Sequence, residues 1–133
     1  EARACGADCI LLIAALLEDE SLWRLLELSG RLGLECLVEA HDEREVHRIV
    51  DIGATIVGIN NRDLKTLTVD LATTERLRSC VPPDRIVVSE SGIRGRADVE
   101  RLAGCGIDAV LVGEALMSAA DPAVKLRELR CIE

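Results

Sequence analysis

The chain has 133 residues, of which 49% are hydrophobic but only 1% aromatic, and its formal net charge is −8 at pH 7. This charge excludes a nucleic-acid partner, because phosphate backbones are bound by basic surfaces and the basic residues here form no cluster. The longest apolar run, Cys9–Leu17, is far shorter than the roughly 20 residues of a membrane-spanning helix, so we expect no membrane partner.

Five short apolar runs recur along the chain, and each is predicted to form a strand. The residues between them show helical periodicity, so each unit is expected to contain one strand and one helix. No linker or low-complexity tract separates the units, which indicates a single α/β domain over residues 1–133 with five parallel βα units. The runs are Cys9–Ile13, Cys36–Val38, Thr55–Ile59, Ile86–Val88 and Ala109–Val112.

Capping residues mark the boundaries of the predicted helices. Ser21 is the predicted N-cap of the first helix, which Gly33 is expected to end. Asp42 and Glu45 have the spacing of a capping box at the start of the second helix. The later helices are predicted to begin at Thr73 or Thr74, at or just before Asp98, and at Asp121 with Pro122 in the first helical position, and Gly104 or Gly106 is expected to end the fourth.

Alternating strands and helices fit either an open doubly wound sheet or a closed barrel. A dinucleotide-binding open sheet would carry GxGxxG after its first strand, and no such motif follows Ile13. Polar residues instead follow several runs at the same relative place, and the active sites of (β/α)8 barrels are built from such positions. We therefore predict a partial TIM (β/α)8 barrel, with strand-end residues Glu39, Asn60, Glu90, and Gly113 with Glu114.

Glu39 is a candidate for proton transfer. A carboxylate at the mouth of a mostly apolar barrel is partly desolvated, which raises its pKa toward neutrality. The alternative is a glutamate that begins the next helix and interacts with the helix dipole. The neighbouring His41 is interpreted as a loop or first-turn residue.

Asn60, Asn61 and Arg62 follow the third strand and are candidates for substrate binding. An amide both donates and accepts hydrogen bonds, and a guanidinium suits a carboxylate or a phosphate. The alternative is an Asx-type turn with Arg62 paired to Asp63 on the surface.

Glycines follow the fourth and fifth strands and predict a phosphate site. TIM barrels commonly bind phosphate in the loops after their last two strands, at the start of a short extra helix. Ser91 and Gly92 lie in the first of these loops and Gly113 in the second, and residues 114–119 have the length of the extra helix.

Cysteine is frequent, but its spacing does not indicate metal binding. None of the six cysteines forms a CxxC pair and the chain has only two histidines, so we expect no metal site. The cysteines are interpreted as small buried hydrophobes in a reducing cytoplasm, a location that the absence of targeting signals also favours.

Longer stretches of the chain resemble indole-3-glycerol phosphate synthase, a family of barrel enzymes in tryptophan biosynthesis. The stretches GADCILLI, LGLECLVEAHDE and, most specifically, GINNRDLKT together with VSESGI carry the resemblance, which covers nearly the whole chain. It implies a carbon–carbon lyase (carboxy-lyase) that closes a ring in 1-(2-carboxyphenylamino)-1-deoxyribulose 5-phosphate, with loss of carbon dioxide and water. The implied partner is a phosphorylated small molecule, and no cofactor or metal is implied.

The same resemblance implies a role for each candidate residue. Glu39 would handle proton transfer during dehydration, Asn60 would hydrogen-bond the reacting substrate, and Arg62 would position its carboxylate. Glu90 would be a further essential active-site carboxylate. The phosphate would be held by Ser91, Gly92, Gly113 and Glu114, the last two chiefly through the backbone.

The resemblance further implies that part of the barrel is missing. Family members have the usual barrel length of about 250 residues, and the motifs align this chain with strands four to eight. The general-acid lysine of strand three, and a second lysine and a glutamate of strand one, would precede Glu1, and neither Lys65 nor Lys125 replaces them. We therefore expect a C-terminal fragment with an incomplete catalytic set, partnered by the missing N-terminal half or by a second copy.

Two other functions stay open. The chain could be a non-catalytic half-barrel that serves as a phosphate-binding or assembly module. It could also belong to another phosphosugar TIM-barrel enzyme, which would bind its own substrate and ignore ligands that carry anthranilate.

Overall fold

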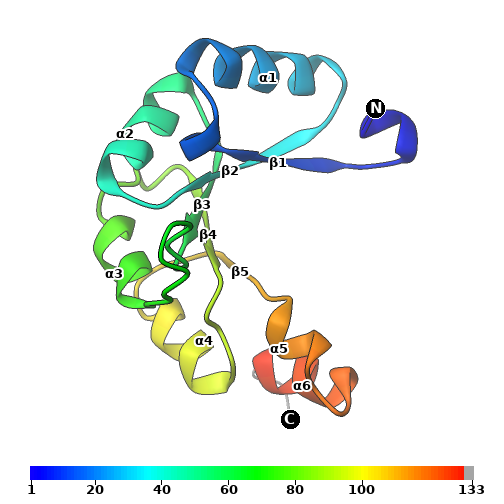
Figure 1. The fold of residues 1–133 in the computed structure, drawn as a ribbon, viewed down its shortest axis with the longest axis vertical. Helices are drawn as coiled ribbons and strands as arrows, with labels where there is room; N and C mark the ends of the chain where they lie inside the picture. The colour runs from blue at the N-terminus through cyan, green and yellow to red at the C-terminus, as the bar shows by residue number, and fades with distance from the viewer. Residues whose placement is uncertain (131–133) are drawn as a thin grey trace.

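The computed structural model describes residues 1–130 and places five parallel strands in one sheet, in the order β1-β2-β3-β4-β5 (Figure 1). Each strand is hydrogen-bonded to the next one in the chain, so every connection moves one position across the sheet. All five predicted strands are confirmed, with ends that differ by one or two residues. The strands are β1 (Cys9–Ile13), β2 (Glu35–Ala40), β3 (Ile56–Asn60), β4 (Ile86–Glu90) and β5 (Ala109–Leu111).

The four connecting helices form an arc along one side of the strands (Figure 1). Two further helices follow β5, and the first of them, with four residues, is the predicted extra helix. Among the described residues, no helix is long and apolar enough to cross a membrane. The helices are α1 (Asp19–Arg31), α2 (Glu43–Ile52), α3 (Ala72–Arg78), α4 (Arg96–Ala103), α5 (Glu114–Met117) and α6 (Pro122–Leu129), and there are 3-10 turns at η1 (Arg3–Cys5) and η2 (Ala14–Leu16).

Alternation of side chains along the strands places the core between the sheet and the helices. Every second residue faces the helices, and Val38, Val57 and Val87 on this face are fully buried. Leu11 and Ile86 point to the opposite face and are 47% and 49% exposed. The sheet therefore buries one face and leaves apolar side chains on the other, as expected for a section of a barrel wall.

Two predicted helix starts are wrong. The first helix begins at Asp19 rather than after Ser21, and two acidic residues in its first turn complement the helix dipole. The third begins at Ala72, because the Asp70 carboxylate accepts a hydrogen bond from the Ala72 N–H at 3.0 Å. The predicted caps Asp42 and Asp121 are confirmed, since each side chain accepts hydrogen bonds from the first turn of its helix.

Asn61 ties the ends of two strands and a helix together. Its amide nitrogen donates to the Ser89 hydroxyl and to the Glu90 carbonyl, both at 3.0 Å, and to the Ser91 carbonyl at 3.1 Å. Its amide oxygen accepts from the Thr74 backbone N–H at 3.1 Å and from the Thr74 hydroxyl at 2.8 Å. Because Asn61 is only 2% exposed, these bonds replace water and fix the end of β3 against the end of β4.

We expect Asn61→Ala to lower the free energy of unfolding by about 2–3 kcal/mol, because Ser89, Thr74 and two backbone carbonyls lose a buried partner together. Urea unfolding followed by far-ultraviolet circular dichroism measures the loss. Thr66→Ala in the same loop removes an exposed hydroxyl and should change the value by less than about 0.5 kcal/mol. Equal effects of the two substitutions would show that the hydrogen bonds of the Asn61 side chain contribute nothing measurable to the free energy of unfolding.

Candidate active site

Three polar residues predicted from the sequence lie at the C-terminal ends of adjacent strands. Glu39 is the penultimate residue of β2, and Asn60 and Glu90 are the last residues of β3 and β4. The strand register pairs Asn60 with Glu90, and Glu39 with Gly58. All three polar residues are buried, with 4%, 8% and 4% of their surfaces exposed for Glu39, Asn60 and Glu90.

The carboxyl groups of Glu39 and Glu90 interact across Gly58. Gly58 has no side chain, and a Cβ at this position would collide with Oε1 of Glu90, which shows how closely that carboxyl group covers the glycine. One oxygen of each carboxyl group is buried without a hydrogen-bond partner among the described residues. Burial, reinforced by the nearby charge of Glu39, raises the pKa of Glu90 from its ordinary value of 4.5 to about 8. Glu90 therefore retains its proton at neutral pH.

His41 contacts the pair from the turn between β2 and α2. Its Nε2 atom lies 3.1 Å from Glu39 Oε1, although the two are not aligned as a hydrogen bond, and its Nδ1 atom lies 3.3 Å from Glu45 Oε2. The predicted position in a turn is confirmed, but the sequence does not indicate that the imidazole lies between two carboxyl groups. Glu45 also accepts a hydrogen bond from the His41 backbone N–H at 2.8 Å, which holds this turn in place.

The structure confirms one part of the alternative weighed for the loop after β3, the Asx-type turn, and leaves the substrate-binding roles as predictions. Asn60 forms the Asx-type turn, because its Oδ1 accepts from the Arg62 N–H at 2.9 Å. Arg62, however, pairs with Glu114 at the start of α5, at 3.1 Å, and the predicted alternative pairing with Asp63 is not observed. The oxygen of Asp63 instead accepts N–H groups from Lys65 and Thr66 within its own loop.

The residues predicted to bind phosphate line one cavity of about 750 Å³. Ser91 and Gly92 have positive φ angles of 66° and 80°, so the backbone turns sharply out of β4 into this cavity. A side chain at Gly92 would be strained by that angle and would also collide with Val69. The other predicted lining residues are Gly113, Glu114 and Arg62.

Two basic residues of this cavity are missing from the sequence prediction. Arg94 follows Gly92 by two residues, and Lys125 comes from α6 and donates from Nζ to the Arg94 carbonyl at 3.3 Å. The position of Arg94 just after the glycine loop is a local signal that could have identified it. Lys125 has no such signal, because the packing of α6 beside the loop brings it there.

These observations define the chain as part of a (β/α)8 barrel of the enzyme type, with an acid pair at the strand ends and a basic cavity beside it. A family model described as indole-3-glycerol phosphate synthase matches residues 1–129. The chain belongs to this family.

Similar proteins agree with this assignment. Indole-3-glycerol phosphate synthase from Dehalococcoides mccartyi is 56% identical over 129 residues, which are 97% of this chain and 50% of that protein. The enzyme of the same name from Acetivibrio thermocellus is 51% identical over 132 residues, 99% of this chain and 51% of its own length. The chain spans about half the length of the curated relatives it matches.

Solved structures confirm the fold. Thiamine phosphate pyrophosphorylase from Pyrococcus furiosus superimposes with a TM-score of 0.78 at 21% identity, covering 98% of this chain and 61% of that one. The 3-hexulose-6-phosphate synthase of Salmonella typhimurium gives a TM-score of 0.73 at 19% identity, covering 96% and 62%.

We expect the stability of the chain to fall as the pH rises from about 4.5 to about 8. In this window an unfolded chain has released the Glu90 proton whereas the folded protein retains it, so raising the pH favours unfolding. Below the window both states hold the proton and the full contribution is present. Glu90→Gln should therefore flatten the curve of urea midpoint against pH, whereas the exposed control Glu114→Gln should preserve its slope. Parallel curves of urea midpoint against pH for Glu90→Gln and the unchanged chain would contradict the raised pKa of Glu90.

Gly58→Ala should separate the two carboxyl groups without unfolding the protein. The added methyl displaces Oε1 of Glu90, which is the far end of a flexible side chain. We expect the pKa of Glu90 to move toward its ordinary range, as followed by a carbon-13 NMR titration of the glutamate carboxyl groups. Gly113→Ala is the matched control, because a Cβ there meets nothing within 4 Å. An unchanged pKa of Glu90 in Gly58→Ala would show that the glycine does not determine how closely the two carboxyl groups interact.

Proposed function

We propose that this chain supplies the substrate-binding face of an indole-3-glycerol phosphate synthase. The proposed reaction closes the indole ring of 1-(2-carboxyphenylamino)-1-deoxyribulose 5-phosphate, with loss of carbon dioxide and water. The observation that carries the proposal is the buried pair of Glu39 and Glu90 beside a basic cavity in the loops that follow β4 and β5. Family membership of residues 1–129 supports the same chemistry.

The acid pair suits a reaction that both delivers and removes protons. Ring closure requires a proton on the carbonyl oxygen as the aromatic carbon attacks, and dehydration requires a proton removed from carbon and another delivered to the departing hydroxyl. In our proposal Glu39 carries the proton transfer of the dehydration step, with His41 contacting it at 3.1 Å. Glu90, whose pKa is raised to about 8, keeps its proton at neutral pH and supports the pair as a neutral acid.

Asn60 and Arg62 are proposed to orient the substrate. The Asn60 Oδ1 atom is engaged by the Arg62 N–H, which holds the amide with its nitrogen available for a substrate oxygen. The Arg62 guanidinium forms an ion pair with Glu114, whose side chain is 76% exposed, and donates a long hydrogen bond of 3.5 Å to the Leu67 carbonyl. Because an exposed pair contributes little energy, a substrate carboxylate can replace Glu114 at low cost.

The phosphate group is proposed to bind in the cavity of about 750 Å³. Ser91 offers a hydroxyl, and the turn through Ser91 and Gly92 presents backbone N–H groups. Gly113 and Glu114 would contribute chiefly through their backbone. Arg94 and Lys125 add positive charge at the cavity wall, which favours a dianionic group.

We further propose that the chain has an incomplete catalytic set and is completed by additional strands. Both edge strands offer unpaired backbone groups, and the face of the sheet opposite the helices exposes Leu11, Ile86 and Leu111. A further protein segment that covers this face would close the barrel and supply a general acid for ring closure. The chain alone should bind the product weakly and turn over little substrate.

A chimaeric enzyme tests this proposal. Residues 1–129 would replace the matching half of the Dehalococcoides mccartyi relative, so that the other half of that protein completes the barrel. We expect the chimaera to release indole-3-glycerol phosphate, detected by indole fluorescence, and Glu39→Gln to reduce its kcat by about 10²- to 10⁴-fold.

The matched control for the chimaera is Glu27→Gln, which changes an exposed glutamate of α1 and should leave kcat unchanged. A folded but inactive chimaera, or one that Glu39→Gln leaves fully active, would overturn the proposed function.

A second candidate function is a phosphate-binding half-barrel without catalysis. It is favoured by one observation: the cavity has three basic residues in its lining, Arg62, Arg94 and Lys125. A well-folded symmetric dimer in size-exclusion chromatography with light scattering, together with phosphate binding and no turnover in the chimaera, would support it over the enzyme.

A further inference from the structure

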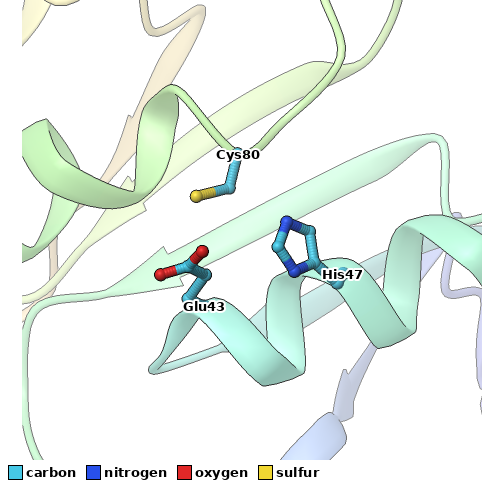
Figure 2. A group of neighbouring side chains, drawn as sticks. All are labelled: Glu43, His47 and Cys80. Atoms are coloured by element: carbon cyan, nitrogen blue, oxygen red, sulfur yellow. The ribbon is translucent and has the colours of Figure 1, made fainter.

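Three side chains with metal-binding atoms gather on the helical side of the sheet, outside the candidate active site (Figure 2). Glu43 and His47 belong to α2, and Cys80 lies in the turn after α3. One carboxylate oxygen, one ring nitrogen and the sulfur lie within 4.8 Å of one another. The sequence prediction of no metal site rests on missing CxxC pairs, and this cluster contains no such pair.

The fold explains why these three groups meet. Residues four apart lie on one face of a helix, so Glu43 and His47 are neighbours on α2. Cys80 is held by its backbone, whose N–H donates to the Leu77 carbonyl at 3.0 Å. Within residues 1–130, none of the three side chains forms a hydrogen bond or ion pair that would occupy its binding atom, and Figure 2 shows them directed toward a common space.

We propose that Glu43, His47 and Cys80 form a binding site for a divalent cation of the zinc class. Thiolate, imidazole and carboxylate are the ligands that zinc takes in proteins, and three protein ligands leave a fourth position for water. A tetrahedral zinc ion holds its ligand atoms roughly 3.3 to 3.8 Å apart. Glu43 and His47 are exposed, so side-chain rotation brings their atoms to that spacing without moving the backbone.

The proposed ion would cross-link two segments of the fold and keep one position open to water. It joins α2 to the turn that leads from α3 into β4. These two segments are apart in the sequence and lie side by side in the folded chain (Figure 2). The ligands are separate from Glu39, Asn60 and Glu90, so the site stands whether or not the proposed function is correct. Binding requires a thiolate and a neutral imidazole, and the affinity should therefore fall as the pH is lowered.

The test uses Co²⁺ and Zn²⁺ with the whole chain, in a buffer with a phosphine reductant that does not bind metal. We expect one Co²⁺ per chain with a thiolate-to-metal charge-transfer band, and displacement of that Co²⁺ by Zn²⁺. Cys80→Ser should abolish the band. His47→Ala, which removes an exposed side chain and spares the core, should weaken Zn²⁺ binding by about tenfold or more in competition with a chromophoric chelator.

Cys105→Ser is the matched control. Like Cys80, Cys105 is half-buried and lies in the turn after a helix, but it has no histidine or glutamate in a metal-binding cluster with it among the described residues. It should retain the band and the affinity. A band of equal strength in Cys80→Ser, or Zn²⁺ affinity that neither Cys80→Ser nor His47→Ala reduces, would overturn the proposal.

Discussion

The chemistry of the candidate site depends on the absence of a side chain at Gly58. This glycine lies in β3 between the strands that carry Glu39 and Glu90, and the Glu90 carboxyl group occupies the space that a Cβ would fill. The two acids are thereby brought together in a buried place, where desolvation and the nearby charge of Glu39 raise the pKa of Glu90. A carboxyl group that keeps its proton at neutral pH can serve as an acid, and burial gives Glu90 this property.

The position of this pair is maintained by a neighbour that performs no chemistry in our proposal. Asn61 joins the end of β3 to the end of β4 and to α3 through its side-chain amide. These bonds hold in place the backbone of Asn60 and Glu90, the last residues of the two strands. The contact between Arg62 and Glu114 is different, because both side chains are partly or largely exposed and the pair is weak. The site thus combines a buried acid pair on tied strand ends with a cationic group that can exchange partners.

The fold could be predicted from the sequence because its signals are local. Short apolar runs predicted the strands, and the polar residues that follow these runs predicted the candidate site. The rest depended on distant residues. Asn60 and Asn61 carry identical amides and follow each other in the sequence. The direction of each side chain decides that Asn61 ties two strand ends together and that Asn60 lies at the candidate site. No local pattern linked Gly58 to Glu90, or Cys80 to His47, because in each case the partner comes from another part of the chain.

The two faces of the sheet suggest how binding and catalysis are divided in the proposed enzyme. The cavity proposed for the phosphate group is lined by residues of the loops after β3, β4 and β5 and of α5 and α6. The acid pair, in contrast, faces the uncovered side of the sheet, where Leu11 and Ile86 are about half exposed. Covering that side would bury this apolar surface and further desolvate the acids, which would strengthen the retention of their proton. In the proposed enzyme, closure of the barrel would therefore stabilise the fold and hold the Glu90 proton more firmly through the same loss of water.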